Sequence, residues 1–508
     1  MRKLRYSLTC AMTLLTAALP VWTGEALSAE TYEGKMPKYV FLFIGDGMSF
    51  PQATSLGIYR GTVDNKFVGT LKEPTIDNIP KAIDPVFTSF PVVGAARTYD
   101  ASKFVTDSAS AATAIASGFK TLDGRIGVDV HEKSIPTIAE LLKEKKKYKI
   151  GIVTSVSLDH ATPAGFYAHQ ASRNNFYEIG LDLIKSDFDY FGGGGFKKPN
   201  GKDGNQKHII DLAKESGYTV STTKADTLAL KPGVGKAIAI NPVFDNESDR
   251  ALPFAIDGDP EGLSLAEYTK KGIELLENDT GFFMMVEGGK IDWAAHANDA
   301  MTLIRDVMAL EDAVKVAIDF YNRHPDDTLI IVTGDHETGG LTMGFGGTMY
   351  DTFFSLLSNQ KLSYGEYAKR VAKYRENKTP FETVVADLAD LYGLAMPGTP
   401  AAEKEPRLVL DERDMTMLKA AYEQSMIPLK ERTQDWSYRI NYSMYEHEPL
   451  QIVVTHALNN KAGIGWTSSA HTGLPAAVYA IGAGQDVFNG FFENTDIFHK
   501  IKMVTDTK

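Results

Sequence analysis

Residues 106–114, TDSASAATA, place an acidic residue and a serine directly ahead of a run of small residues. The alanine-rich run favours a helix that ends at Gly118, and Asp107 and Ser108 are residue types common at a helix start. Ser108 would then lie where unpaired backbone N–H groups and the helix dipole favour negative charge. That position suits ionisation of a hydroxyl and binding of an anion such as phosphate. The segment by itself is more typical of an ordinary capping serine, so the prediction of a nucleophile depends on the rest of the chain.

Residue types that bind metals border apolar, strand-like runs in five further segments. They are Asp46, His160, Thr162, Glu287, Asp292, His296, Asp335, His336 and His471. In an open α/β sheet, ligands bind outside the carboxyl ends of the strands, so we expect these side chains to meet at one edge. The combination of aspartate, glutamate and histidine predicts a metal centre there.

The stretch IDWAAHAND separates Asp292 from His296 by four residues. If the stretch is helical, this spacing puts both side chains on one face. Together with His471 they make one carboxylate and two imidazoles, a ligand set that suits an open zinc site. A lone pair at this spacing is more often two solvated side chains, so the prediction depends on the other segments.

The motifs IGDGM, TDSASAAT, DHATP, EGGKIDWAAH, TGDHE and SSAHTG, in this order, resemble those of the alkaline phosphatase family. The resemblance covers residues 39–484. It implies a phosphomonoesterase with a serine nucleophile, two zinc ions and one magnesium ion, acting on small phosphate monoesters. Members of the family are usually dimers, so the resemblance also implies a homodimer.

The resemblance assigns a role to each of these residues. The first zinc would take Asp292, His296 and His471, the second Asp46, Asp335, His336 and the Ser108 alkoxide, and the magnesium Asp46, Thr162 and Glu287. Arg173, expected at the end of a helix that starts at Pro163, would hold the phosphate, because its planar fork can bind two oxygens. Two in-line displacements with a phosphoserine intermediate would follow.

Two positions depart from part of the family. Some members have aspartate where this chain has His160, and lysine where it has Trp293. A histidine so close to the third site favours zinc or cobalt there over magnesium. Trp293 removes a positive charge near the phosphate, which predicts weak binding and fast release of product phosphate.

Apolar runs alternate with amphipathic stretches over residues 39–340, a pattern that predicts a doubly wound, mostly parallel α/β sheet flanked by helices. We expect helices at 134–147, 163–173, 264–277, 302–320, 378–394 and 411–426. The alternation breaks after residue 341, and residues 346–460 are predicted to form a largely helical insertion subdomain. The insertion carries none of the metal set, so both a lid over the site and a decoration without a catalytic role stay open.

Residues 1–29 combine a basic start, a short apolar stretch and an Ala-Leu-Ser-Ala end, which predicts a secretory signal peptide. A catalytic domain at 30–508 would then lie in the periplasm or the medium. The only cysteine, Cys10, lies inside the signal. Cleavage removes three basic residues and one acidic residue, so the net charge of −12 becomes −14. This acidity argues against nucleic-acid and anionic-membrane partners, and no later segment is apolar enough to span a membrane.

Proteins with the same fold also have other activities, and the sequence bears on each of them. A sulfatase needs a Cys or Ser in a C/S-x-P-x-R context, which the residues around Ser108 lack. A phosphodiesterase is harder to exclude, although Arg173 favours a dianionic monoester. A non-catalytic periplasmic metal- or phosphate-binding protein is a third alternative, disfavoured by the presence of both a nucleophile and a full ligand set.

Overall fold

The computed structural model describes residues 32–64, 73, 75, 79–442 and 447–507. The predicted signal peptide, with Cys10, lies outside the described residues. Across the described part of the chain, no helix has the length and apolar character needed to cross a membrane.

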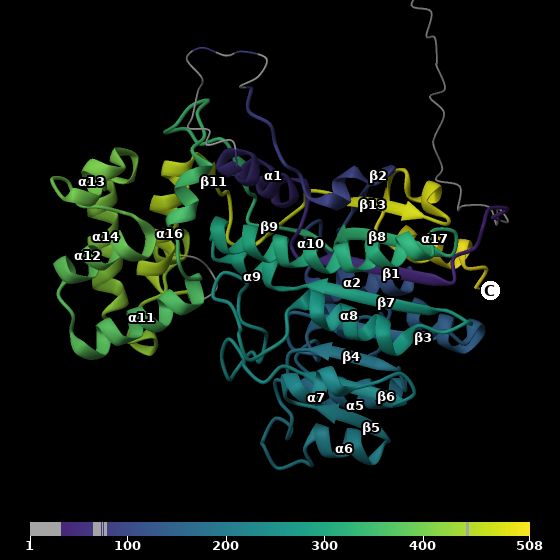
Figure 1. The fold of residues 1–508 in the computed structure, drawn as a ribbon. Coiled ribbons are helices and arrows are strands. Elements are labelled where there is room, and N and C mark those ends of the chain that lie inside the picture. Colours follow the sequence, from purple (N-terminus) through teal and green to yellow (C-terminus); the bar gives the residue numbers. More distant parts are fainter. Residues whose placement is uncertain (1–31, 65–72, 74, 76–78, 443–446, 508) are drawn as a thin grey trace, which may run out of the picture. The chain divides into compact units, whose positions relative to one another are not determined.

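A ten-stranded sheet forms the centre of the described chain, with strand order β14-β2-β13-β8-β1-β7-β3-β4-β6-β5 (Figure 1). The strands are β1 (Tyr39–Gly45), β2 (Val92–Arg97), β3 (Lys149–Thr154), β4 (Tyr190–Gly193), β5 (Tyr218–Ser221), β6 (Lys236–Ile240), β7 (Phe282–Gly288), β8 (Thr328–Gly334), β13 (Ala476–Gly482) and β14 (Gly490–Glu493). Only β13 runs antiparallel to its neighbours β8 and β2, while the other adjacent pairs in this sheet are parallel. The predicted fold class is therefore confirmed.

Helices cover both faces of the central strands. Every residue of β1, β7 and β8 is buried, which explains why these strands are continuously apolar. Successive side chains of β7 point to opposite faces. The Phe282 ring packs on Phe320 of helix α10 (Ala300–Arg323) at 5.5 Å between centroids, while the Phe283 ring stacks on Phe166 at 6.2 Å.

Most of the expected helices are present, and two need correction. The helices are α1 (Phe50–Asp64), α2 (Ser108–Ser117), α3 (Ile138–Leu141), α4 (Ala161–Ala164), α5 (Phe176–Ser186), α6 (Ile209–Glu215), α7 (Lys224–Ala229), α8 (Leu265–Leu276), α9 (Lys290–His296), α10 (Ala300–Arg323), α11 (Tyr364–Asn377), α12 (Phe381–Tyr392), α13 (Pro400–Lys404), α14 (Glu412–Ser425), α15 (Trp436–Tyr442), α16 (Pro449–Ala462) and α17 (Thr495–Val504). The helix expected at 134–147 starts only after its Thr137 cap and ends in a π-helical turn at Leu142–Lys146.

The prediction of a helix at 163–173 is wrong. The helical conformation ends with α4 at Ala164, because residues 168–170 turn away to form a backbone bridge between Gln170 and Ile126. The two amide–carbonyl bonds of that bridge measure 3.0 and 2.8 Å.

The chain between β10 (Thr342–Met343) and β11 (Ile464–Gly465) is largely helical and contains α11 to α16 (Figure 1). It is anchored on the residues that follow α9. Asn459 Nδ2 donates to the Asn298 carbonyl at 2.6 Å, and Gln360 Nε2 donates to the Asp299 carboxylate at 2.8 and 2.9 Å. The helical segment therefore contacts residues that closely follow the predicted zinc ligand His296 in the sequence. Its accessory role stays a prediction.

Candidate metal centre and nucleophile

Ser108 is the first residue of α2, as the sequence predicts. The Asp107 side chain caps the helix by accepting from the Ser110 amide at 3.0 Å, and Gly118 ends it in the left-handed conformation with φ 77°. The Ser108 hydroxyl is buried and lies 3.1 Å from His336 Nε2. The helix thus presents its nucleophile candidate, together with its free N–H groups, to a predicted metal ligand.

The neighbouring strands β8, β1 and β7 bring four of the predicted ligands together. Asp46 follows the last residue of β1, Asp335 and His336 follow β8, and Glu287 is the penultimate residue of β7. These parallel strands end at the same edge of the sheet. His471 reaches that edge from the opposite direction, because antiparallel β13 starts there.

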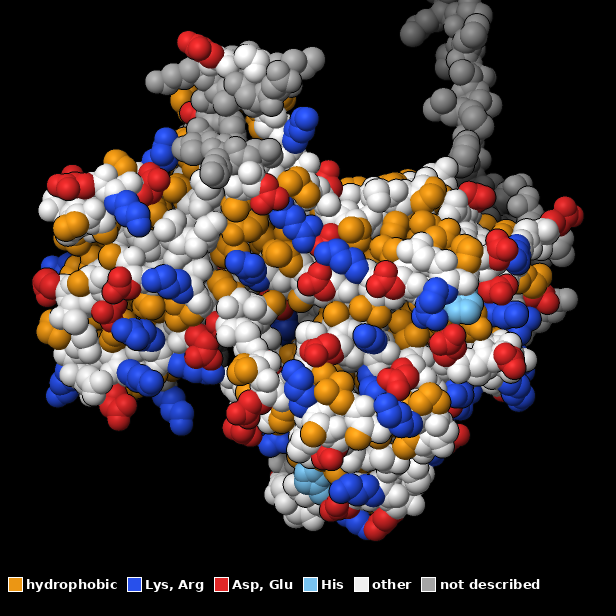
Figure 2. All heavy atoms as spheres, in the orientation of Figure 1, with side chains coloured by type: hydrophobic (Ala, Val, Ile, Leu, Met, Phe, Trp, Pro, Cys, Tyr) orange, Lys and Arg blue, Asp and Glu red, His pale blue; other side chains and the backbone are white. Residues whose placement is uncertain are grey.

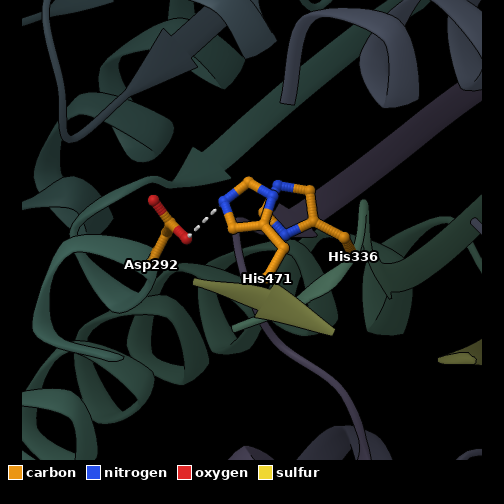
Figure 3. Close-up of side chains that lie close together, drawn as sticks. All are labelled: Asp292, His336 and His471. Carbon is orange, nitrogen blue, oxygen red and sulfur yellow. Dashed lines mark ion pairs between the residues drawn. The ribbon is translucent and has the colours of Figure 1, made fainter. Parts of the chain in front are cut away.

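The first group consists of Asp292, His296 and His471. His296 Nε2 lies 3.3 Å from Asp292 Oδ2 and 3.1 Å from His471 Nε2, and His471 Nε2 lies 3.5 Å from Asp292 Oδ1. The His296 and His471 Nδ1 atoms each donate to a backbone carbonyl at 2.7 Å, which fixes the tautomer in which Nε2 can bind a metal ion. Figure 3 shows Asp292 and His471 pointing toward each other, with the His336 ring stacked beside His471 at 3.6 Å between centroids.

The second group consists of Asp46, Asp335 and His336. His336 Nε2 lies 3.4 Å from an oxygen of each aspartate. All three side chains are fully buried, and ligand atoms from the three lie within 4.8 Å of one another. Because His336 Nε2 lies 3.1 Å from the Ser108 hydroxyl, this group directly contacts the nucleophile candidate.

The third group shares Asp46 with the second. Thr162 Oγ1 donates to Asp46 Oδ2 at 3.3 Å, and Thr154 Oγ1 donates to Glu287 Oε2. Ligand atoms of Asp46, Glu287 and His160 lie within 4.8 Å of one another. His160 is therefore close enough to ligate, and its ring packs edge-on against Trp293 at 5.8 Å between centroids.

Burial and neighbouring charge shift the titration of these groups. Burial raises the pKa of Glu287 to about 7, and burial together with Asp335 raises the pKa of Asp46 well above its ordinary value. Burial also lowers the pKa of His160 to about 3 and that of His336 well below its ordinary value. These histidines are therefore neutral at pH 7, the form that binds metal ions.

Arg173 comes from the loop after α4. Its NH1 donates to Asp107 Oδ2 at 2.9 Å, and the positive charge of Arg173 contributes to the low pKa values of Asp107 and His160. The guanidinium is therefore held beside Ser108 by the same aspartate that caps α2.

Two kinds of contact at the site have no sequence signal. Thr338 Oγ1 donates to Asp292 Oδ1 at 2.6 Å, and the Thr106 and Ser469 carbonyls orient His471 and His296. A threonine two residues after a ligand histidine is common, and backbone carbonyls have no residue identity. The sequence identifies Asp107 only as a helix-start residue, and no local pattern predicts its bond to Arg173.

Known proteins resemble this chain in sequence. A sequence model of the alkaline phosphatase family matches residues 37–507. Alkaline phosphatase 3 of Bacillus subtilis is 31% identical over 486 residues, which cover 93% of this chain and 90% of that protein. The Escherichia coli alkaline phosphatase is 30% identical over 361 residues, covering 62% of this chain and 73% of that protein.

Solved structures agree in fold. The cold-active alkaline phosphatase of the psychrophile Shewanella sp. superposes with a TM-score of 0.71 at 26% identity, covering 92% of this chain and 99% of that one. A variant of the alkaline phosphatase from the Antarctic bacterium TAB5, with magnesium bound in its M3 site, has a TM-score of 0.60 at 26% identity and covers 93% and 99% of the two chains. This chain belongs to the alkaline phosphatase family and is a phosphatase.

Proposed function

We propose that the chain hydrolyses phosphate monoesters to an alcohol and inorganic phosphate through a phosphoserine at Ser108, with two zinc ions and one magnesium ion. The observation that carries the proposal is the position of the Ser108 hydroxyl. It starts α2, lies 3.1 Å from His336 Nε2 and borders a cluster of buried carboxylates and neutral imidazoles.

The ligand groups fit metal ions by their own chemistry. Asp46 Oδ1, Asp335 Oδ2, Glu287 Oε1 and His160 Nδ1 are buried and have no hydrogen-bond partner among the described residues. Burying carboxylates side by side without a cation is strongly unfavourable. Bound cations would supply both the missing partners and the missing positive charge.

The donor types suggest which ion each group holds. Asp292, His296 and His471 suit an open zinc site, and so do Asp46, Asp335 and His336 with Ser108 as a further ligand. Asp46, Thr162 and Glu287 offer hard oxygen donors that suit magnesium, and His160 beside them favours zinc or cobalt. The bound ions would lower the pKa of the serine hydroxyl, stabilise the leaving oxygen and generate a nucleophile from water.

The residues of this chain then divide the work of two displacements. Ser108 Oγ attacks phosphorus, and the bond to the alcohol oxygen breaks in line with the attack. Arg173 and the first N–H groups of α2 bind the non-bridging oxygens, and Asp107 keeps Arg173 in place. A water molecule then attacks the phosphoserine, which restores the Ser108 hydroxyl and releases phosphate.

Two further properties belong to the same proposal. The predicted signal peptide would send the chain to the periplasm or the medium, where small phosphate monoesters are its substrates. The chain would act as a homodimer.

A pair of chromogenic substrates tests the proposal. The purified protein should hydrolyse 4-nitrophenyl phosphate far faster than bis(4-nitrophenyl) phosphate. Dialysis against a chelator should abolish the activity, and zinc with magnesium should restore it. A faster rate on the diester would identify a phosphodiesterase, and metal binding without either activity would identify a binding protein.

A further inference from the structure

A cavity of about 1010 Å³ lies between the loop that follows β6 and helix α11. The two walls are tied together, since Lys369 Nζ of α11 donates to the Asp245 carbonyl of the loop at 2.8 Å. Figure 1 shows α11 beside this teal loop and close to α9. Trp293 lines the cavity and directly follows the proposed zinc ligand Asp292. The cavity therefore adjoins the metal centre.

Aromatic rings form one part of the cavity wall. Trp293, Phe254 and Tyr364 line it, and the Phe254 and Tyr364 rings contact each other at 5.0 Å between centroids. Lys290 is fully buried, pairs with Asp245 and places its Nζ 4.5 Å from the Trp293 ring centre and 3.6 Å from that of Phe254. This buried cation holds two of the rings in fixed positions before any ligand arrives.

His447 marks a polar point in the same cavity. Its ring contacts Tyr364 at 5.4 Å between centroids, and its Nε2 is buried without a hydrogen-bond partner among the described residues. Burial and the nearby His296 lower the pKa of His447 to about 3, so the imidazole is neutral. A buried ring nitrogen without a partner needs a hydrogen bond from a ligand or a water molecule.

Four carboxylates and four cationic side chains line the cavity. Asp245 pairs with Lys290, Asp249 with Lys197 and Glu366 with Lys369, while Asp257 accepts a hydrogen bond from the Ser363 amide at 2.8 Å. The exposed side chains of Lys361 and Lys373 also line the cavity, and no carboxylate of the described residues forms an ion pair with either. Lys and Arg side chains gather over α11 in the space-filling view (Figure 2). On a chain with a net charge of −12, this wall is locally able to attract an anion.

We propose that this cavity is the subsite for the leaving group, and that it favours a planar leaving group with a second anionic group, as in a nucleoside bisphosphate. The proposal rests on the proposed function, because the phosphate that reacts must occupy the metal centre. The ring of the leaving group would lie against Trp293 and Phe254, with its polar edge at His447. Its second anion would face Lys361 and Lys373.

Three substrates separate the parts of the proposal. Glycerol 2-phosphate has neither a ring nor a second anion, adenosine 5′-monophosphate adds the ring, and adenosine 3′,5′-bisphosphate adds both. The initial rate of phosphate release should give kcat/KM values that rise in this order for the unaltered enzyme. The advantage of the bisphosphate over the monophosphate should shrink in 1 M salt, since the lysines are exposed.

The double charge reversal Lys361→Glu/Lys373→Glu tests the basic wall. The ratio of kcat/KM for the bisphosphate to that for glycerol 2-phosphate should fall about tenfold, a size expected for two exposed charge contacts. The matched double variant Lys404→Glu/Lys419→Glu changes two exposed lysines elsewhere in the helical segment and should keep the ratio. Equal ratios in all three proteins, or an equal fall in both variants, would overturn the anionic part.

Trp293 tests the ring part. Trp293→Leu should reduce the ratio of adenosine 5′-monophosphate to glycerol 2-phosphate, and Trp293→Phe should restore it, because only the second variant keeps a ring. The same ratio in both variants would overturn the aromatic part. If the unaltered enzyme hydrolysed none of the three monoesters, the proposed function would fail. Activity without any change of ratio would overturn only the subsite.

Discussion

Two regions of this protein bury charged side chains in opposite ways. In the helical segment, Arg432 is fully buried, and its NH2 binds Glu448 Oε2 at 2.7 Å while its Nε donates to the Ile427 carbonyl at 2.8 Å. Arg375 pairs with the same glutamate and donates to the Ser425 carbonyl at 2.7 Å. Each charge in this Arg375–Arg432–Glu448 cluster has a partner of opposite sign within the protein.

The carboxylates of the metal centre lack partners of this kind. Asp46, Asp335 and Glu287 lie together, each with a buried oxygen that has no hydrogen-bond partner among the described residues. The comparison indicates two roles for buried charges. A cluster whose charges are paired within the protein holds the fold together, whereas a cluster with unpaired buried oxygens indicates a bound ligand. Four substitutions test this difference.

The largest effect is expected from removal of the nucleophile. Ser108→Ala should lower kcat about a thousandfold or more, because no other hydroxyl begins α2. Zinc content and phosphate binding should persist, as measured by atomic absorption and by product inhibition. Ser117→Ala is the matched control, since that hydroxyl bonds the Thr113 carbonyl of its own helix at 2.6 Å. A phosphoenzyme labelled at another residue would refute the assignment.

Disruption of the Arg375–Arg432–Glu448 cluster should lower stability and leave catalysis unchanged. Glu448→Gln removes the charge that two arginines share, and should lower the free energy of unfolding by about 3 kcal/mol. The midpoint of urea unfolding measures this change, and kcat of the folded protein should stay unchanged. Glu376→Gln, an exposed glutamate of α11, should shift the midpoint little. Loss of kcat in folded Glu448→Gln would show that the two regions are coupled.

Arg173→Ala removes the positive charge that pairs with Asp107, the residue before Ser108. A monoester dianion offers two oxygens to the arginine fork, and a diester has an ester group in place of one. We expect kcat/KM for monoesters to fall about tenfold to a hundredfold, and that for diesters to fall less. The ratio of the two rate constants is the measurement. Equal losses would mean that Arg173 supports the site generally.

The smallest effect concerns the third group. His160→Asp replaces an imidazole by a hard oxygen donor and should raise the affinity for magnesium about tenfold. Titration of the metal-depleted protein with magnesium, followed by activity, measures the change. His456→Asp would disrupt a fold contact with Asn298, so the exposed His131→Asp is the better control. An unchanged titration would show that His160 does not tune this group.

The sequence by itself determined the features that depend on neighbours along the chain. The small-residue run with its cap and its final glycine sufficed for α2, and four-residue spacing sufficed to place Asp292 and His296 on one face of α9. The alternation of apolar runs with amphipathic stretches determined the fold class. Since the parallel strands of that fold end at a common edge, it also determined where the ligands meet. The order of the motifs and the family resemblance assigned each predicted ligand to one of the three metal groups.

Only the tertiary structure decided the contacts between segments that are distant along the chain. The helix expected up to Arg173 stopped early because Gln170 pairs with Ile126, a residue that no local pattern connects to it. The bond from Arg173 to Asp107 spans 66 residues, and the cavity beside Trp293 needs α11 to pack against the loop after β6. Helix caps and periodicity act within a few residues, whereas such contacts form only when distant segments are packed together.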